Sequence, residues 1–113
     1  MAVNPDTLVI WHNPRCSKSR QALAYLQDRG LTPEVRLYLK DPPSADEIRA
    51  MLTALDLPPA ALLRKEGAAL KSESDAAIIA AMAADSALIE RPVIRKGARA
   101  VIGRPVEAIA PLL

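Results

Sequence analysis

The N-terminal third of the chain contains two apolar segments separated by a helical pattern. Residues 7–11 (Thr-Leu-Val-Ile-Trp) form a short, uncharged and β-rich run, typical of a strand buried on both faces. From Cys16 onward, apolar groups recur at helical spacing until Gly30, which stands where a helix C-cap belongs. Residues 35–39 then alternate as a second strand does. This order predicts a βαβ unit with parallel strands.

The middle of the chain has a helical pattern throughout. Ser44 and Glu47 have the spacing of a capping box, and apolar residues follow on one face of the expected helix. The two prolines at 58–59 end this helix and can begin a second, and a third is expected at about 75–84. We therefore predict a helical insertion at about 42–89.

The last part of the chain returns to strands. Residues 92–95 and 100–103 are apolar segments joined by a tight turn at 96–97, which predicts an antiparallel hairpin. Pro105 suits the first turn of a closing helix with one apolar face. The order β-α-β, helical insertion, β-β-α predicts an α/β protein with a thioredoxin-like fold and a mixed four-stranded sheet.

Composition bounds the class of protein. Half of the residues are apolar and a quarter are charged, which is typical of one globular domain over residues 1–113. Aromatic residues make up 3% and the net charge is +2 with dispersed basic groups, so we expect no nucleic acid partner. Residues 1–6 lack the features of a signal peptide, and the longest uncharged apolar run, 76–84, is too short to cross a bilayer. We expect a cytoplasmic protein without a membrane partner.

Cys16 is the only cysteine, and it lies where the first strand gives way to the first helix, with cationic residues on both sides. A helix N-terminus with such neighbours can lower a thiol pKa from about 8.5 to roughly 3.5–7.5. Amides of the first helical turn can face the sulfur or a bound oxyanion. A free cysteine can instead be a small buried hydrophobic group. The polar, cationic surroundings favour a reactive thiolate.

The residues around Cys16 argue against several kinds of site. Ser19 occupies the position of a second thiol in a Cys-x-x-Cys motif, so a dithiol oxidoreductase is disfavoured and an external thiol is needed. In the phosphatase loop, five residues separate cysteine from arginine, but Arg20 follows Cys16 after three and Ala22 occupies the required place. Cys16 and His12 alone do not form a closed ligand set, so we predict no metal site.

Arginine occurs at the ends of three later predicted elements, at Arg64, Arg91 and Arg104. A guanidinium group can give a tetrahedral dianion paired, charge-assisted hydrogen bonds that lysine cannot reproduce. Taken singly, each arginine is more commonly a solvated surface group, since arginine is usually exposed. Spacing along the chain does not link them to Cys16.

Together these segments resemble the glutaredoxin-coupled arsenate reductases of the ArsC family, especially its shorter chromosomal members. The resemblance runs over nearly the whole chain, and its most specific segments are residues 12–20, 37–39, 62–65, 90–93 and 102–107. It implies an arsenate reductase with Cys16 as nucleophile and Arg64, Arg91 and Arg104 as oxyanion-binding residues. It also implies a cis bond between Arg91 and Pro92, whereas the sequence alone is equally compatible with a trans bond.

The resemblance assigns supporting roles and partners as well. His12 corresponds to a family histidine thought to keep the sulfur ionised, and Ser19 to a hydroxyl that can donate to it. Without the resemblance, His12 is an ordinary strand-end histidine and Ser19 an ordinary first-turn residue. The implied partners are arsenate, glutathione as co-substrate and glutaredoxin, with no bound cofactor. We expect a monomer.

Two other functions are compatible with this fold. One is a non-catalytic regulator resembling the Spx-type proteins that contact RNA polymerase, although Ser19 argues against a disulfide switch of that kind. The other is a monothiol reductase of another small oxidised substrate, because a shared fold does not determine function. The three arginines favour an oxyanion.

Overall fold

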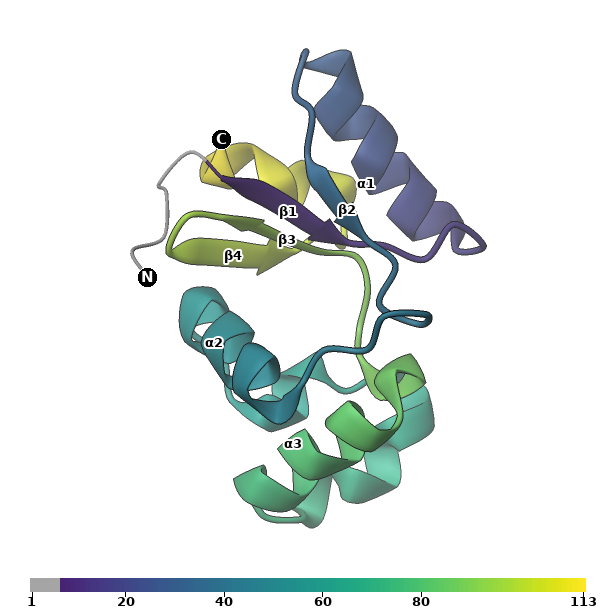
Figure 1. The fold of residues 1–113 in the computed structure, drawn as a ribbon, viewed down its shortest axis with the longest axis vertical. Helices are drawn as coiled ribbons and strands as arrows, with labels where there is room; N and C mark the ends of the chain where they lie inside the picture. The colour runs from purple at the N-terminus through teal and green to yellow at the C-terminus, as the bar shows by residue number, and fades with distance from the viewer. Residues whose placement is uncertain (1–6) are drawn as a thin grey trace.

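A four-stranded sheet forms the centre of the computed structural model, which describes residues 7–113 (Figure 1). The expectation about a signal peptide concerns residues 1–6 and lies outside them. The strands are β1 (Leu8–Trp11), β2 (Glu34–Arg36), β3 (Val93–Lys96) and β4 (Arg99–Ile102), in the order β2-β1-β3-β4. β1 is parallel to β2 and antiparallel to β3, and β3 is antiparallel to β4. This pairing confirms the predicted mixed sheet of an α/β fold.

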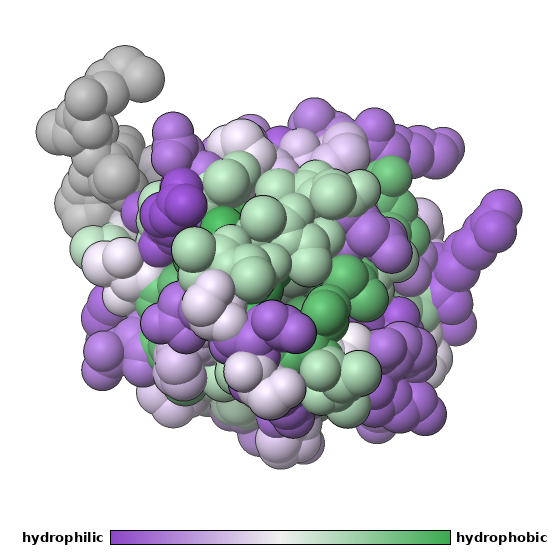
Figure 2. Space-filling view, turned by 90° about the horizontal axis from the view of Figure 1, so that it is seen from below, coloured by the Kyte–Doolittle hydropathy of each residue, from purple (hydrophilic) through white to green (hydrophobic). Residues whose placement is uncertain are grey.

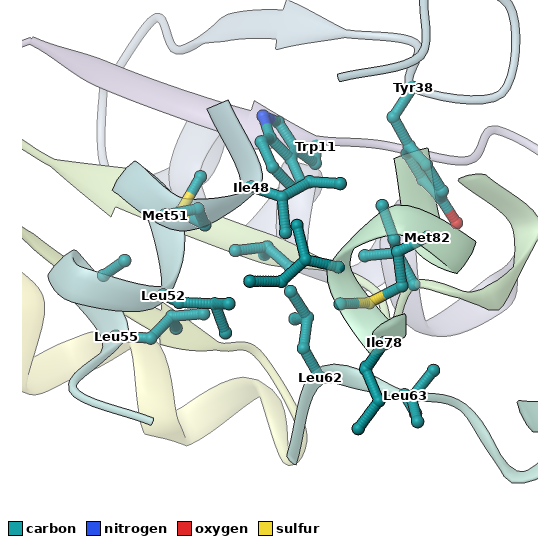
Figure 3. Close-up of a cluster of buried hydrophobic side chains, with 14 residues drawn as sticks. Trp11, Tyr38, Ile48, Met51, Leu52, Leu55, Leu62, Leu63, Ile78 and Met82 are labelled. Atoms are coloured by element: carbon teal, nitrogen blue, oxygen red, sulfur yellow. The ribbon is translucent and has the colours of Figure 1, made fainter. Parts of the chain in front are cut away.

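Helices cover both faces of the sheet. α1 (Ser17–Asp28) and the C-terminal 3-10 helix η4 (Val106–Leu112) lie on the upper side in Figure 1, and α2 (Ala45–Leu55) and α3 (Asp75–Ala84) lie on the lower side. Successive strand residues point to opposite faces. Ile10 accordingly packs in the core between the sheet and the helices α1 and η4. Trp11 packs in the core between the sheet and the helices α2 and α3 (Figure 3).

The second strand is shorter than predicted. It ends at Arg36 instead of Leu39, because the amides of Lys40 and Asp41 both donate to the carbonyl of Leu37 and close a turn. The alternating apolar residues Val35, Leu37 and Leu39 are all exposed, so their alternation does not mark the buried face of a strand. Tyr38 is 1% exposed and points into the lower core, and its two leucine neighbours are exposed.

The helical insertion begins and ends much as predicted. The capping box of Ser44 and Glu47 is present at the start of α2, and Ser74 caps α3. The helix expected after the two prolines is the short 3-10 helix η1 (Pro59–Leu62). Two further 3-10 helices were not predicted, η2 (Lys65–Ser72) and η3 (Ser86–Leu88). The closing helix is also of the 3-10 type: the amide of Ala108 donates to the carbonyl of Pro105, three residues back.

Exposed alanines of α3 contribute to a weakly hydrophobic surface on the lower layer. Figure 2 shows weakly hydrophobic residues at the centre of the face seen from below, with hydrophilic residues around them. Within the uncharged run of α3, only Ile78, Ile79 and Met82 are buried, and several alanines face outward. Within residues 7–113 no helix is long and apolar enough to cross a membrane.

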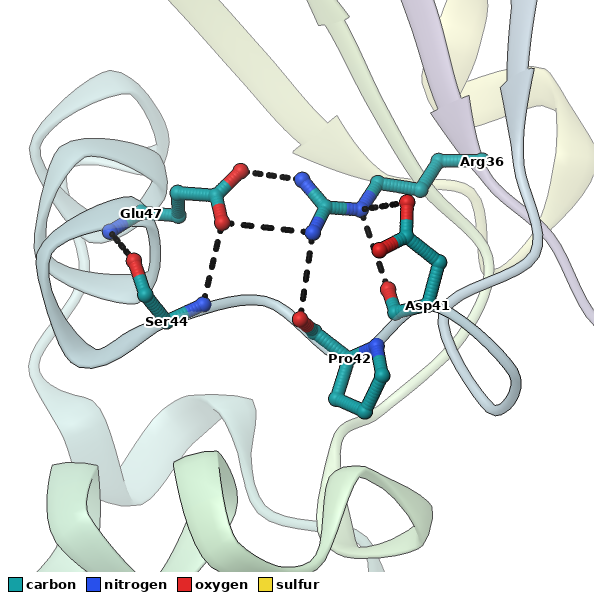
Figure 4. A network of polar contacts seen from close by, with 5 residues as sticks. All are labelled: Arg36, Asp41, Pro42, Ser44 and Glu47. Atoms are coloured by element: carbon teal, nitrogen blue, oxygen red, sulfur yellow. Dashed lines mark hydrogen bonds and ion pairs between the residues drawn. The ribbon is translucent and has the colours of Figure 1, made fainter.

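Arg36 fixes the segment that connects β2 to α2 (Figure 4). Its guanidinium donates to the carbonyls of Asp41 and Pro42, each at 3.1 Å, and pairs with the carboxylate of Glu47. The hydrogen bond from Arg36 is the main cause that lowers the pKa of Glu47. The turn that carries Tyr38 is therefore held at both of its ends.

Candidate active site

Cys16 is the N-cap of α1, at the end of the loop that follows β1. Its backbone is extended (φ −96°, ψ 123°), and its amide donates to the carbonyl of Asn13 at 3.0 Å. Among the described residues, no side chain caps this helix end. The amides of the first turn therefore remain available to an anion beside the sulfur. The residue is 9% exposed, so the thiol lies at the boundary between core and solvent.

His12 and Ser19 form a buried pair behind the loop. Nδ1 of His12 lies 2.6 Å from Oγ of Ser19, and the amide of Asn13 donates to the same hydroxyl at 3.0 Å. Burial, and then the positive charge of Arg20, lowers the pKa of His12. The imidazole is therefore neutral at pH 7 and holds the shape of the loop by hydrogen bonding. Within residues 7–113, no hydrogen bond connects Ser19 to Cys16.

A bridge between two insertion segments places Arg64 beside residues 90 and 91. Leu63 pairs with Ile89 in an isolated antiparallel bridge. The amide of Arg64 donates to the carbonyl of Leu88 at 2.9 Å, and the amide of Glu90 donates to the carbonyl of Leu62 at 2.7 Å. These contacts join positions that lie far apart in the sequence.

A glycine lets Arg104 approach the same place. The amide of Gly103 donates to the carbonyl of Pro92 at 2.9 Å, and a Cβ atom at position 103 would lie 2.9 Å from Cδ1 of Ile94. Nε of Arg104 then donates to the carbonyl of Arg91 at 2.6 Å. Its Nη2 lies 3.8 Å from Sγ of Cys16. This contact joins the thiol to the arginines. The bond between Arg91 and Pro92 is cis, as the family resemblance implied, and so is the bond between Arg104 and Pro105.

The three predicted arginines line one open hollow of about 340 Å³, together with Lys65 and Glu90. We call Arg64, Arg91 and Arg104 the arginine cradle. The side chain of Arg91 is 12% exposed, and its Nε and Nη1 are buried without a hydrogen-bond partner in the described part of the chain. A buried, unpartnered donor is unfavourable, and a bound anion would satisfy it.

Glu90 is a carboxylate within this cationic hollow, and the sequence analysis did not single it out. Its Oε1 accepts from the amide of Arg91 at 3.1 Å, and it lies 3.5 Å from Nε of Arg104 and 3.9 Å from Nη1 of Arg91. Its position directly before a predicted anion-binding arginine was the available signal.

Tyr38 is the second site neighbour to which the sequence assigned no role. Burial raises the pKa of Tyr38 to about 12, and the charged groups acting on its phenol are Arg64, Cys16, Glu90 and Arg104. The phenol therefore stays protonated at the edge of the cradle. The turn after β2, which the strand prediction missed, brings it there.

The structure thus places Cys16 against Arg104 of the arginine cradle, and it places His12 and Ser19 behind the loop. Among residues 7–113, no group of three or more His, Cys, Asp or Glu side chains is arranged to hold a metal ion. A neighbouring thiol and a set of guanidinium groups can bind a tetrahedral anion and attack its central atom.

Comparisons with known proteins give one consistent result. The model of the ArsC family matches residues 11–112. An arsenate reductase from Neisseria meningitidis serogroup B is 38% identical over 112 residues, covering 92% of this chain and 96% of that protein. One from Haemophilus influenzae is 36% identical over 115 residues, covering 95% of this chain and 99% of that protein. The solved structure of an arsenate reductase from Vibrio cholerae has a TM-score of 0.89 and 40% identity, covering 97% of this chain and all of that chain.

Proposed function

The chain belongs to the ArsC family, and on that premise we propose that it reduces arsenate to arsenite with Cys16 as its single nucleophile and with glutathione and glutaredoxin as reductants. Relatives that carry the name arsenate reductase support the activity. The geometry around Cys16 supports the mechanism.

The arginine cradle is suited to bind arsenate. Arsenate is a tetrahedral oxyanion, and the guanidinium of Arg91, whose Nε and Nη1 have no hydrogen-bond partner among residues 7–113, would donate charge-assisted hydrogen bonds to it. Arg64 and Arg104 approach the same hollow from other segments. Their positive charge offsets the repulsion between the anion and the thiolate.

Cys16 would perform the first chemical step. The sulfur attacks arsenic, an As–S bond forms, one As–O bond breaks, and the departing oxygen leaves as water after taking up protons from solvent. Arsenic stays As(V) in this step. Arg104, 3.8 Å from the sulfur, offers positive charge to both the attacking thiolate and the bound oxyanion.

Electrons then come from external thiols, because the chain has no second cysteine. Glutathione replaces a second oxygen, which leaves as water, and forms another As–S bond. A glutaredoxin thiolate attacks the glutathione sulfur, a mixed disulfide forms, and the electron pair of the broken As–S bond stays on arsenic. Arsenic is thereby reduced to As(III), and hydrolysis of the bond to Cys16 releases arsenite and the free thiol.

His12 and Ser19 would support this chemistry through the loop. Their hydrogen bonds run to each other and to the amide of Asn13, so they hold the segment that presents Cys16. Direct donation from Ser19 to the sulfur stays a prediction. Action as a monomer without a bound cofactor is part of the same proposal.

The observation that carries the proposal is the 3.8 Å contact between Sγ of Cys16 and Nη2 of Arg104, one of the three arginines that line the hollow. The test is arsenate-dependent NADPH oxidation in a mixture of glutathione, glutathione reductase and glutaredoxin. We expect turnover by the wild type, none by Cys16→Ser, and a loss of about 100-fold or more in kcat/KM for Arg91→Ala.

A matched control is Arg49→Ala, which removes an exposed arginine of α2 that pairs only with Asp46 among the described residues. It should retain the wild-type rate. A wild-type rate no higher than that of Cys16→Ser would refute the reductase proposal. Turnover of a different oxidised substrate by the same thiol would instead support the broader monothiol reductase.

A further inference from the structure

Glu90 is the single acidic residue among those that line the hollow, and its presence there is unexpected for an anion site. A carboxylate repels the ligand that three arginines attract. Its side chain is 25% exposed, and its position is fixed by the amide of Arg91 at 3.1 Å. It is thus held in the hollow by the backbone of the cradle itself.

The second carboxylate oxygen of Glu90, Oε2, accepts no hydrogen bond from residues 7–113. The contacts of Glu90 with the amide of Arg91, with Nη1 of Arg91 and with Nε of Arg104 all involve Oε1. Oε2 takes part in none of these three. An ionised carboxylate is an acceptor only, so Oε2 can bind a ligand atom that carries a proton and repels one that does not.

Tetrahedral oxyanions differ in this respect. Near neutral pH, arsenate and phosphate keep at least one hydroxyl group, whereas sulfate has none. At mildly alkaline pH, hydrogen arsenate, hydrogen phosphate and sulfate carry the same charge of two, but only arsenate and phosphate keep a proton. A site with a fixed acceptor therefore discriminates strongly against a ligand that lacks the donor.

We propose that Glu90 is a specificity residue that accepts a hydrogen bond from the hydroxyl of the bound oxyanion and excludes fully deprotonated anions such as sulfate. The inference rests on the proposed function, since it concerns the same anion site. It assigns recognition of charge to the arginine cradle and recognition of the proton to Glu90.

The test measures anion affinity without turnover. Isothermal titration calorimetry at mildly alkaline pH compares arsenate, phosphate and sulfate on Cys16→Ser and on the double variant Cys16→Ser/Glu90→Gln. The parent should bind arsenate and phosphate at least about tenfold more tightly than sulfate, which corresponds to roughly 1.4 kcal/mol. Glu90→Gln should remove most of this ratio, because its amide can donate to sulfate.

Glu66→Gln in the Cys16→Ser background is the matched control. Glu66 pairs with Nε of Arg64 at 3.3 Å but is 49% exposed and does not line the hollow. Removing its charge should shift the affinities of the two dianions together and leave their ratio unchanged. Circular dichroism and a thermal melt check that each variant is folded.

The outcomes separate this inference from the reductase proposal. An unchanged ratio of arsenate to sulfate affinity in folded Glu90→Gln, including equal weakening of all anions, would overturn the specificity role, even if the wild type reduces arsenate. A collapsed ratio would support it, even if the coupled assay shows no reduction. Absence of any oxyanion binding by the folded parent would overturn both.

Discussion

Replacing Arg91 with methionine should stabilise the anion-free protein while abolishing its anion binding. The guanidinium is nearly buried, and its Nε and Nη1 lack hydrogen-bond partners. An unsatisfied buried donor costs about 1–3 kcal/mol, and more when it is charged. The 3.9 Å ion pair with Glu90 offsets part of this, and that carboxylate keeps Arg104 as a partner in the variant. We expect a net gain of about 1–2 kcal/mol for Arg91→Met.

The assay is urea denaturation and thermal melting with and without phosphate or arsenate. For a domain of this size, the gain corresponds to a rise in Tm of roughly 3–10 °C. Saturating anion should stabilise the wild type, by about 2.7 kcal/mol at one hundred times Kd, and should leave Arg91→Met unchanged. A folded variant with a lower Tm in anion-free buffer, or with an undiminished response to anion, would refute the reasoning.

Three further predictions concern the groups that shape the site. Gly103→Ala should lower the free energy of unfolding by about 1–3 kcal/mol, measured in urea, because the new Cβ would lie 2.9 Å from a neighbouring side chain. Glu47→Gln should destabilise the protein slightly at neutral pH, since both partners are partly exposed. Because Arg36 lowers the folded pKa of Glu47, this difference should shrink as pH falls below about 4, and a pH-independent difference in urea would contradict it. His12 has a lowered folded pKa, so stability should fall as pH drops below about 6.5, and the slope of urea midpoints against pH should be smaller in His12→Gln.

The sequence predicted the helix starts well where capping residues mark them. The capping box of Ser44 and Glu47 and the cap at Ser74 act through neighbouring backbone amides, so α2 and α3 were found at their observed starts. The strand after Gly30 was drawn too long, because Val35, Leu37 and Leu39 alternate with polar or aromatic residues as in a strand, although all three are exposed. The hydrogen bonds to the carbonyl of Leu37 that end the strand leave no mark in the pattern of apolar residues.

The site depended on contacts that no local signal carries. The family resemblance named the three arginines, but their proximity requires the bridge between Leu63 and Ile89 and the close approach of Gly103 to Pro92. Both are tertiary contacts between distant segments. The acidic residue in the cradle was visible as a neighbour of Arg91, yet only the fold shows that its carboxylate faces Arg104.

The Leu63–Ile89 bridge, which positions Arg64, also determines which parts of the molecule a bound anion would connect. Arg64 belongs to the helical layer, whereas Arg104 follows the last strand of the sheet, so the hollow spans the seam between two parts of the molecule. An oxyanion that binds both arginines would add a noncovalent link between the helical layer and the sheet. Occupancy of the hollow should therefore slow hydrogen exchange at the amides of Arg64 and Glu90, whose hydrogen bonds form the bridge that positions Arg64.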